Sequence, residues 1–166
     1  MTGPSAAERI AAARASGDLA SLTQTTPYTR FLGITLERSD DAFVCRLPYR
    51  ADLIGNPLLP ALHGGVIGAL LESAAIFHLI WESDVNAIPK TINLSIDYLR
   101  PGRPLDTFAR GVATKQGRRV ANVRVEAWQE ARERPIAAAH CHFLLAGEGG
   151  ASAPPSPVPL REGGDG

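Results

Sequence analysis

The spacing of apolar and polar side chains predicts strands over much of the chain. Within residues 120–126, the apolar Ala121, Val123 and Val125 alternate with other residues, a period of two that is typical of a half-buried strand. Together with turn signals, such patterns predict strands over residues 31–36, 42–47, 91–98, 106–115, 119–130 and 135–146. Short connections at 116–119 and 130–134 suit hairpins, which favour an antiparallel sheet.

One segment is apolar on every side instead of on one face. It begins near Gly65 and ends near Trp81, a pattern that indicates a buried helix. It contains Glu72 and His78 and falls short of a typical membrane span of ~20 residues, so we expect no membrane contact. The predicted sheet must wrap around this helix to cover it.

The predicted fold class is therefore α+β: an antiparallel sheet of about five to six strands wrapped around one long central helix. Residues 1–26 are expected to form an N-terminal helix and linker, with Ser5 and Glu8 as a capping box and Gly17 as the stop signal. Residues 27–146 form the main domain. Residues 147–166 are poor in apolar groups, and we predict a disordered tail.

Composition excludes several function classes. The 166 residues are 45% hydrophobic, enough for one domain with a sizeable core. The 17 Lys and Arg balance the 17 Asp and Glu, which argues against a nucleic-acid-binding protein. Cys45 and Cys141 lie in apolar segments and are expected to be buried, reduced thiols. The N-terminal residues lack the apolar core of a signal peptide, so we expect a cytoplasmic location.

The candidate chemistry lies in residues 56–73, NPLLPALHGGVIGALLES. Glu72 is the only charged residue between Gly64 and Trp81, and burying a carboxylate is costly unless it is paired or hydrogen-bonded. His63, Gly64 and Gly65 open the helix, where free N–H groups and the positive dipole end favour an oxyanion. Structural explanations are also open, since Glu72 can pair with an arginine and the glycines can form a tight turn.

The helix geometry constrains how these groups can cooperate. Glu72 lies eight residues beyond Gly64, which is about 12 Å along a helix. A glutamate side chain cannot reach back over that distance. If both residues act on one carbonyl, each must come from a different subunit, and a two-fold dimer would then hold two shared sites.

The segment HGGVIGALLES, followed by KTINLSIDYLRPG at residues 90–102, resembles the PaaI-type thioesterases of the 4-hydroxybenzoyl-CoA thioesterase superfamily. The resemblance covers about residues 27–146 and rests on His-Gly-Gly with an acid nine residues after the His, and on Leu-Arg-Pro after a strand. It implies a hotdog fold, a homodimer or a dimer of dimers, and hydrolysis of a small or medium acyl- or aryl-CoA to the free acid and CoA.

The resemblance also implies roles for individual residues. The N–H of Gly64 polarises the thioester carbonyl, and Glu72 is the nucleophile or general base. Asn56 helps to position the carbonyl or the water, although its spacing to His63 is one residue longer than in some relatives. His63 orients the loop or contacts the substrate, and Gly65 lets the substrate approach the backbone closely.

Further residues are expected to bind the substrate. Thr91 is the nearest match to a hydroxyl residue that holds the attacking water, and Asn93 is expected on the same strand face. Arg100 and Arg103 are candidates for the CoA phosphates, with Arg118 and Arg119 as rivals. CoA is part of the substrate, so no cofactor is expected, and His78, His140 and His142 lack a convincing metal-binding spacing.

Three other interpretations remain open from the sequence. A hotdog hydratase or dehydratase would pair a His with an acid near the helix, which Glu72 and His78 fit poorly. A non-catalytic acyl-CoA-binding protein on the same scaffold would have no need of Glu72 and His-Gly-Gly together. An interaction protein without a small-molecule site leaves Glu72 unexplained.

Overall fold

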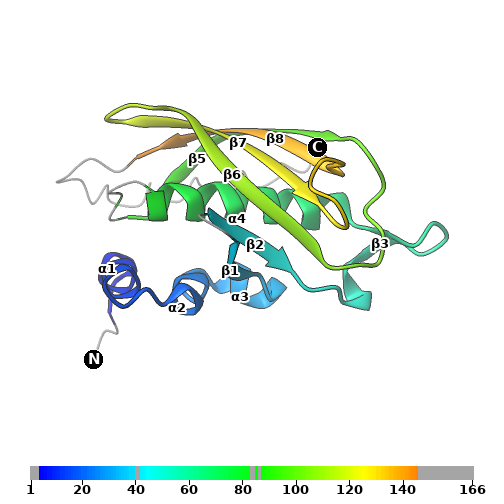
Figure 1. Ribbon diagram of the computed structural model, residues 1–166, viewed down its shortest axis with the longest axis horizontal. Helices are drawn as coiled ribbons and strands as arrows, with labels where there is room; N and C mark the ends of the chain where they lie inside the picture. The colour runs from blue at the N-terminus through cyan, green and yellow to red at the C-terminus, as the bar shows by residue number, and fades with distance from the viewer. Residues whose placement is uncertain (1–3, 40–41, 83–84, 86, 146–166) are drawn as a thin grey trace, which may run out of the picture.

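The computed structural model describes residues 4–39, 42–82, 85 and 87–145. Its centre is a six-stranded antiparallel sheet of strand order β1-β2-β6-β7-β8-β5, which curls around the long helix α4 (Figure 1). The predicted fold class is confirmed. The predicted tail, 147–166, lies outside the described residues. The elements are β1 (Thr35–Ser39), β2 (Ala42–Leu47), α4 (Gly64–Glu82), β5 (Lys90–Tyr98), β6 (Thr107–Gln116), β7 (Val120–Trp128) and β8 (Ala137–Leu144).

Helix α4 is the core of the domain, as its apolar pattern predicts. Leu70, Leu71 and Ile80 are fully buried, and they pack with alternate residues of the strands around them. By length and composition α4 is also a candidate membrane span, but more than half of that window is buried inside the fold. The side of α4 that carries Val66, Ala69, Glu72 and Ile76 is only partly buried.

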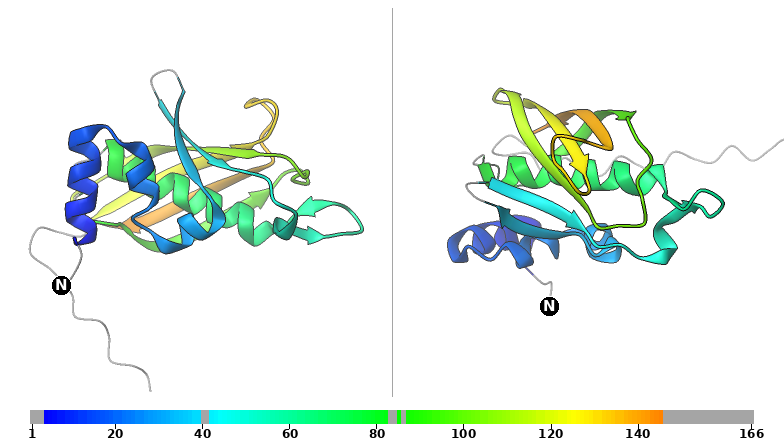
Figure 2. Two further views of the ribbon diagram at one scale, coloured as in Figure 1. Left: turned by 90° about the horizontal axis from the view of Figure 1, so that it is seen from below. Right: turned by 45° about the vertical axis from the view of Figure 1, so that its right-hand side comes forward.

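Three short helices pack beneath β1, β2 and the C-terminal end of α4 (Figures 1 and 2). They are α1 (Ala6–Ser16), α2 (Leu19–Thr23) and α3 (Pro27–Leu32). The predicted capping box of Ser5 and Glu8 is present, and Gly17 ends α1 at a φ of 69°. Ile10 and Leu22 are fully buried in the same core as α4, and the Arg14 guanidinium donates to the carbonyl oxygen of Ile80.

The prediction of a strand over residues 31–36 is wrong for its first half. Pro27 begins α3, where its fixed φ favours a helix start, and Gly33 ends the helix in the left-handed region at a φ of 73°. Strand β1 begins only at Thr35. Pro27 and Gly33 together therefore signal a short helix between the expected N-terminal linker and β1.

The loop before α4 carries a small hairpin that projects at the N-terminal end of that helix (Figure 2). It follows a short 3-10 helix, η1 (Ala51–Leu53), and consists of β3 (Ile54–Asn56) and β4 (Ala61–Leu62). Two backbone hydrogen bonds fix its base: His63 N–H to Leu53 O at 2.9 Å, and Leu62 N–H to Gly102 O at 2.8 Å. The chain therefore enters α4 in a fixed direction.

Candidate active site

The first turn of α4 leaves one backbone donor free. The N–H groups of Val66 and Ile67 donate to His63 O at 3.0 and 3.2 Å, and the N–H of Gly65 donates to His63 Nδ1 at 3.0 Å. Among the described residues, the Gly64 N–H has no hydrogen-bond partner. In a trans peptide the N–H points opposite to the carbonyl, so the bonds to His63 O direct the Gly64 N–H away from the helix.

Both glycines of the motif leave little room for a side chain. A Cβ on Gly64 would lie 3.2 Å from the hydroxyl and ring of Tyr98, and a Cβ on Gly65 would lie 3.0 Å from His63 Nδ1. The Tyr98 hydroxyl also donates to Gly64 O at 2.8 Å. The Gly64–Gly65 peptide is thus held at its carbonyl by Tyr98 and at its N–H by His63, and the turn next to the free donor is rigid.

The carboxylate of the site comes from the middle of α4. The Thr91 hydroxyl, at the start of β5, donates to Glu72 Oε1 at 2.6 Å, a short bond of the kind made to carboxylates. The sequence predicts a buried carboxylate here, but the Glu72 side chain is only partly buried and its partner is a hydroxyl instead of an arginine. The structure therefore brings the predicted Glu72 and Thr91 together.

A β-bulge turns Thr91 toward the helix. Thr91 lies opposite Phe143 and Asn93 lies opposite His142, so Ile92 is an extra residue in β5. Directly opposed residues share a sheet face, and Phe143 is fully buried on the inner face. Thr91 consequently points inward, whereas Asn93 shares the outer face with His142. The prediction that Thr91 and Asn93 share one face is wrong, because the bulge changes the alternation between them.

The two cysteines are unpaired and buried, in agreement with the sequence prediction. Cys141 lies opposite Leu94 on the inner face. Burial, together with the Glu72 carboxylate, raises the pKa of the Cys141 thiol to about 12, and burial likewise raises the pKa of Cys45. A thiol that stays protonated is a poor nucleophile.

Asn56 serves the hairpin turn in this structure. Its Oδ1 accepts the N–H groups of Leu58 and Leu59 at 3.0 and 3.3 Å, as in an Asx turn. The preceding Gly55 lies so close to His63 that a Cβ would be 2.7 Å from the His63 Cα. These contacts tie the hairpin to the start of α4, and the role of Asn56 in positioning a carbonyl or a water stays a prediction.

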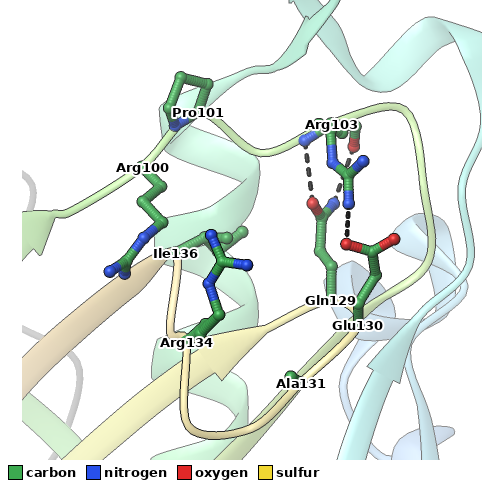
Figure 3. Close-up of a pocket in the computed structure, with 8 residues that line it drawn as sticks. All are labelled: Arg100, Pro101, Arg103, Gln129, Glu130, Ala131, Arg134 and Ile136. Carbon is green, nitrogen blue, oxygen red and sulfur yellow. Dashed lines mark hydrogen bonds and ion pairs between the residues drawn. The ribbon is translucent and has the colours of Figure 1, made fainter.

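Arg100 and Arg103 meet at one pocket of about 250 Å³ (Figure 3). The pocket also contains Arg134, which sequence reasoning missed, although it belongs to a charged hairpin connection at 130–134. Arg118 and Arg119 are exposed and do not line it. The other residues in its wall are Pro101, Gln129, Glu130, Ala131 and Ile136.

A second cavity joins this pocket to the start of α4. It measures about 280 Å³, and Gly64 and Tyr98 line one part of it while Arg100 and Pro101 line another. Arg100 and Pro101 line both cavities, so the cavity at Gly64 and the arginine pocket adjoin at this segment. Within the described residues, no group of three or more His, Cys, Asp or Glu side chains is placed to hold a metal ion.

Comparisons with known proteins identify the family. The family model of the thioesterase superfamily matches residues 59–136, which include His63, Gly64, Glu72 and Thr91. The chain is 34% identical over 134 residues to the "medium/long-chain acyl-CoA thioesterase YigI" of Escherichia coli K12, covering 72% of this chain and 85% of that protein.

Solved structures extend the likeness to the whole fold. A protein from Chromobacterium violaceum shares 41% identity with a TM-score of 0.68, covering 83% of this chain and 96% of that one. A Bacillus halodurans protein solved with CoA has the same fold at 23% identity and a TM-score of 0.64, covering 82% of this chain and 91% of its own. With its hotdog architecture and this level of identity to its relatives, the chain belongs to the thioesterase superfamily.

Proposed function

We propose that the protein hydrolyses medium- or long-chain acyl-CoA thioesters to the free acid and CoA. The observation that carries this proposal is that one helix of a thioesterase-superfamily member presents both a hydroxyl-bound carboxylate, Glu72, and an N-terminal donor, the Gly64 N–H, that has no partner among the described residues. The sequence alone suggests a small or medium acyl or aryl group. The name of the Escherichia coli relative supports the longer chains.

In the proposed mechanism, the thioester oxygen accepts the Gly64 N–H. Glu72 either attacks the carbonyl carbon or takes a proton from a water that attacks it, with the Thr91 hydroxyl orienting the carboxylate. The carbon–sulfur bond breaks and CoA leaves as a thiolate. If Glu72 attacks, water then hydrolyses the mixed anhydride, which frees the acid and restores the carboxylate. If Glu72 acts as the base, the water oxygen becomes part of the acid. In both routes the thiolate takes a proton that the attacking water has released. One backbone donor to the developing oxyanion is expected to supply roughly 3 kcal/mol of transition-state stabilisation.

We further propose that each site is shared by two copies of the chain. Gly64 and Glu72 lie eight residues apart on α4, about 12 Å along its axis, so one copy cannot direct both at one carbonyl. Strand β5 is one of the two edge strands of the sheet, and Ile92 on it is 58% exposed. The hairpin tip adds Leu58 and Leu59, which are 95% and 60% exposed. A second copy pairing with β5 would cover these groups.

The cavity at Gly64 and the adjoining arginine pocket suit the pantetheine and nucleotide parts of CoA. The pantetheine arm would lie along Tyr98 and Pro101, and the phosphates would reach Arg100, Arg103 and Arg134. Guanidinium groups bind phosphate oxygens through paired, charge-assisted hydrogen bonds. In Figure 3, Arg100 and Arg134 lie on one side of the pocket, and the pair of Arg103 with Glu130 lies on the other.

The test is thiol release from a panel of acyl-CoAs with short, medium, long and aryl groups. We expect the highest kcat/KM for medium or long chains. Turnover of none of these thioesters, with saturable binding of one, would identify a non-catalytic acyl-CoA-binding protein and contradict the proposal. A preference for short or aryl groups would keep the reaction but contradict the proposed substrate class.

A further inference from the structure

The arginine pocket contains one negative charge of its own. Arg100, Arg103 and Arg134 line it together with Glu130, whose carboxylate forms an ion pair with the Arg103 guanidinium. Both partners are well exposed, at 55% and 69% of their side-chain surface, so the pair adds little to folding stability. A carboxylate oxygen here occupies donors that a phosphate oxygen would need.

Resting on the proposed function, we propose that Glu130 is an internal anion that occupies Arg103 in the free enzyme and is displaced by a phosphate of CoA. Glu130 thereby sets the affinity of the enzyme for CoA and its thioesters. When phosphate binds, Arg103 exchanges one anionic partner for another. The gain in binding free energy is therefore smaller than it would be for an unpaired arginine. The pocket keeps an excess of two positive charges, which still attracts phosphate.

The backbone of Arg103 is fixed independently of this ion pair. Gln129 is buried; its Oε1 accepts the Arg103 N–H at 3.0 Å, and its Nε2 donates to Arg103 O at 2.8 Å. The same Nε2 donates to Leu105 O and to the Thr107 hydroxyl. Because Gln129 holds the main chain, removing Glu130 releases the guanidinium without moving the loop that carries it.

The other two arginines of the pocket differ in their side-chain hydrogen bonds. The Arg100 guanidinium donates to Pro135 O at 2.5 Å. The Arg134 guanidinium has no hydrogen-bond or ion-pair partner among the described residues, and the Arg134 backbone N–H donates to Ala131 O at 3.0 Å. Arg132, two residues before Arg134 on the same hairpin, stacks on the Trp128 ring and is absent from the pocket wall. The hairpin therefore offers a pocket cation and a matched control of equal charge.

The experiment measures the dissociation constant of CoA by titration calorimetry for wild type and four variants. Glu130→Gln should lower the Kd by about threefold to tenfold, since it frees one guanidinium at the surface. Glu133→Gln, a change of the same charge on the same hairpin, should leave the Kd within twofold. Arg134→Ala should raise the Kd by about tenfold, and Arg132→Ala should change it little.

Kinetics separate this effect from a general change of structure. With acyl-CoA, Glu130→Gln should lower KM by a similar factor without raising kcat. With an acyl thioester of N-acetylcysteamine, which lacks the nucleotide, neither parameter should change.

Each failure has a distinct signature. One contrary result is that Arg134→Ala weakens CoA binding while Glu130→Gln and Glu133→Gln both keep the wild-type Kd. In that case the internal-anion proposal is wrong, and the assignment of this pocket to CoA is retained. If Arg134→Ala also has no effect while hydrolysis persists, the pocket is not the CoA site and both ideas about it fail. If wild type hydrolyses no acyl-CoA, the proposed function itself fails. Higher CoA affinity in Glu130→Gln alone, with Arg134→Ala weaker, is the result that supports the inference.

Discussion

The donor half and the carboxylate half of α4 are built in different ways. The donor half is the start of the helix, from His63 to Gly65. Backbone hydrogen bonds and Tyr98 hold it, and the first turn of the helix sets the direction of the Gly64 N–H. The carboxylate half presents Glu72, a flexible side chain on a partly open side of the helix. Its direction depends on one hydrogen bond from Thr91.

Both irregularities of the strands contact α4 beyond its first turn. In the described part of the six-stranded sheet, the register shifts in two places, at Thr91/Asn93 in β5 and at Ala113/Lys115 in β6. The first bulge supplies the hydroxyl for Glu72, and the second presents the Ala113 N–H to His78 on α4. The donor is therefore positioned by the regular geometry of a helix, whereas the carboxylate half requires local departures from regular strands.

Replacing the carboxylate should give the largest effect on activity. Glu72→Gln keeps the size of the side chain but removes the base or nucleophile, so kcat should fall by about a hundredfold to ten-thousandfold. The measurement is steady-state thiol release with the best acyl-CoA of the panel. Glu82→Gln, at the exposed end of the same helix, is the matched control and should retain activity. Equal activity of wild type and Glu72→Gln would contradict the assignment of Glu72.

Mixing two inactive variants tests whether the two halves act across subunits. Gly64→Val forces a side chain against Tyr98, and Glu72→Gln removes the carboxylate. In a mixed dimer, one site combines the intact Gly64 of one copy with the intact Glu72 of the other. Random exchange should recover about a quarter of wild-type activity, since half the dimers are mixed and each has one working site.

The control for this mixing is wild type mixed with the double variant Gly64→Val/Glu72→Gln, in which the mixed dimers have no intact site of this kind. Subunit exchange is followed with differently tagged copies. Absence of recovery in the first mixture, with exchange demonstrated, would show that the two halves do not share a site across the interface.

The bulge in β5 predicts that substitutions of Thr91 and Asn93 have unequal effects on activity. Thr91→Val keeps the shape of the side chain but removes the donor to Glu72, which should lower kcat by about tenfold, as for one hydrogen bond to a charged group. Asn93→Ala, on the outer face, should leave kcat within about twofold. If Asn93→Ala is the more damaging change, the inner placement of Thr91 has no catalytic consequence.

These residues also show what sequence reasoning can and cannot reach. The continuous apolar segment identifies α4, the alternation of apolar residues identifies most strands, and the capping signals identify α1, because each depends on neighbours within a few residues. The local pattern does not reveal the bulge at Ile92, since β-bulges depend on pairing with a distant strand. Arg134 comes from a hairpin far from the Leu-Arg-Pro segment, and only the fold places it beside Arg100.

The bulge in β6 contacts a titratable residue of α4, His78, so folding stability should depend on pH at this contact. His78 Nε2 accepts the Ala113 N–H at 3.0 Å, an arrangement that requires a neutral ring nitrogen. Burial lowers the pKa of His78 from its usual 6.5; the Glu82 carboxylate partly offsets this effect, and Arg110 adds to it. The unfolded chain therefore binds this proton more readily. The stabilising contribution is complete above about pH 6.5 and is lost as the pH falls toward the lower folded-state pKa.

Urea unfolding at pH 7.5 and pH 5.5 tests this small effect. His78→Gln keeps an acceptor for Ala113 but does not titrate, so it should lose less unfolding free energy between the two pH values than wild type does. His140→Gln, on the exposed outer face, should follow wild type. An identical pH dependence in wild type and His78→Gln would mean that this contact does not couple α4 to the proton. A difference confined to His78→Gln would show that acid weakens the contact between α4 and the bulge in β6, in contrast to the backbone bonds at the start of α4, which do not titrate.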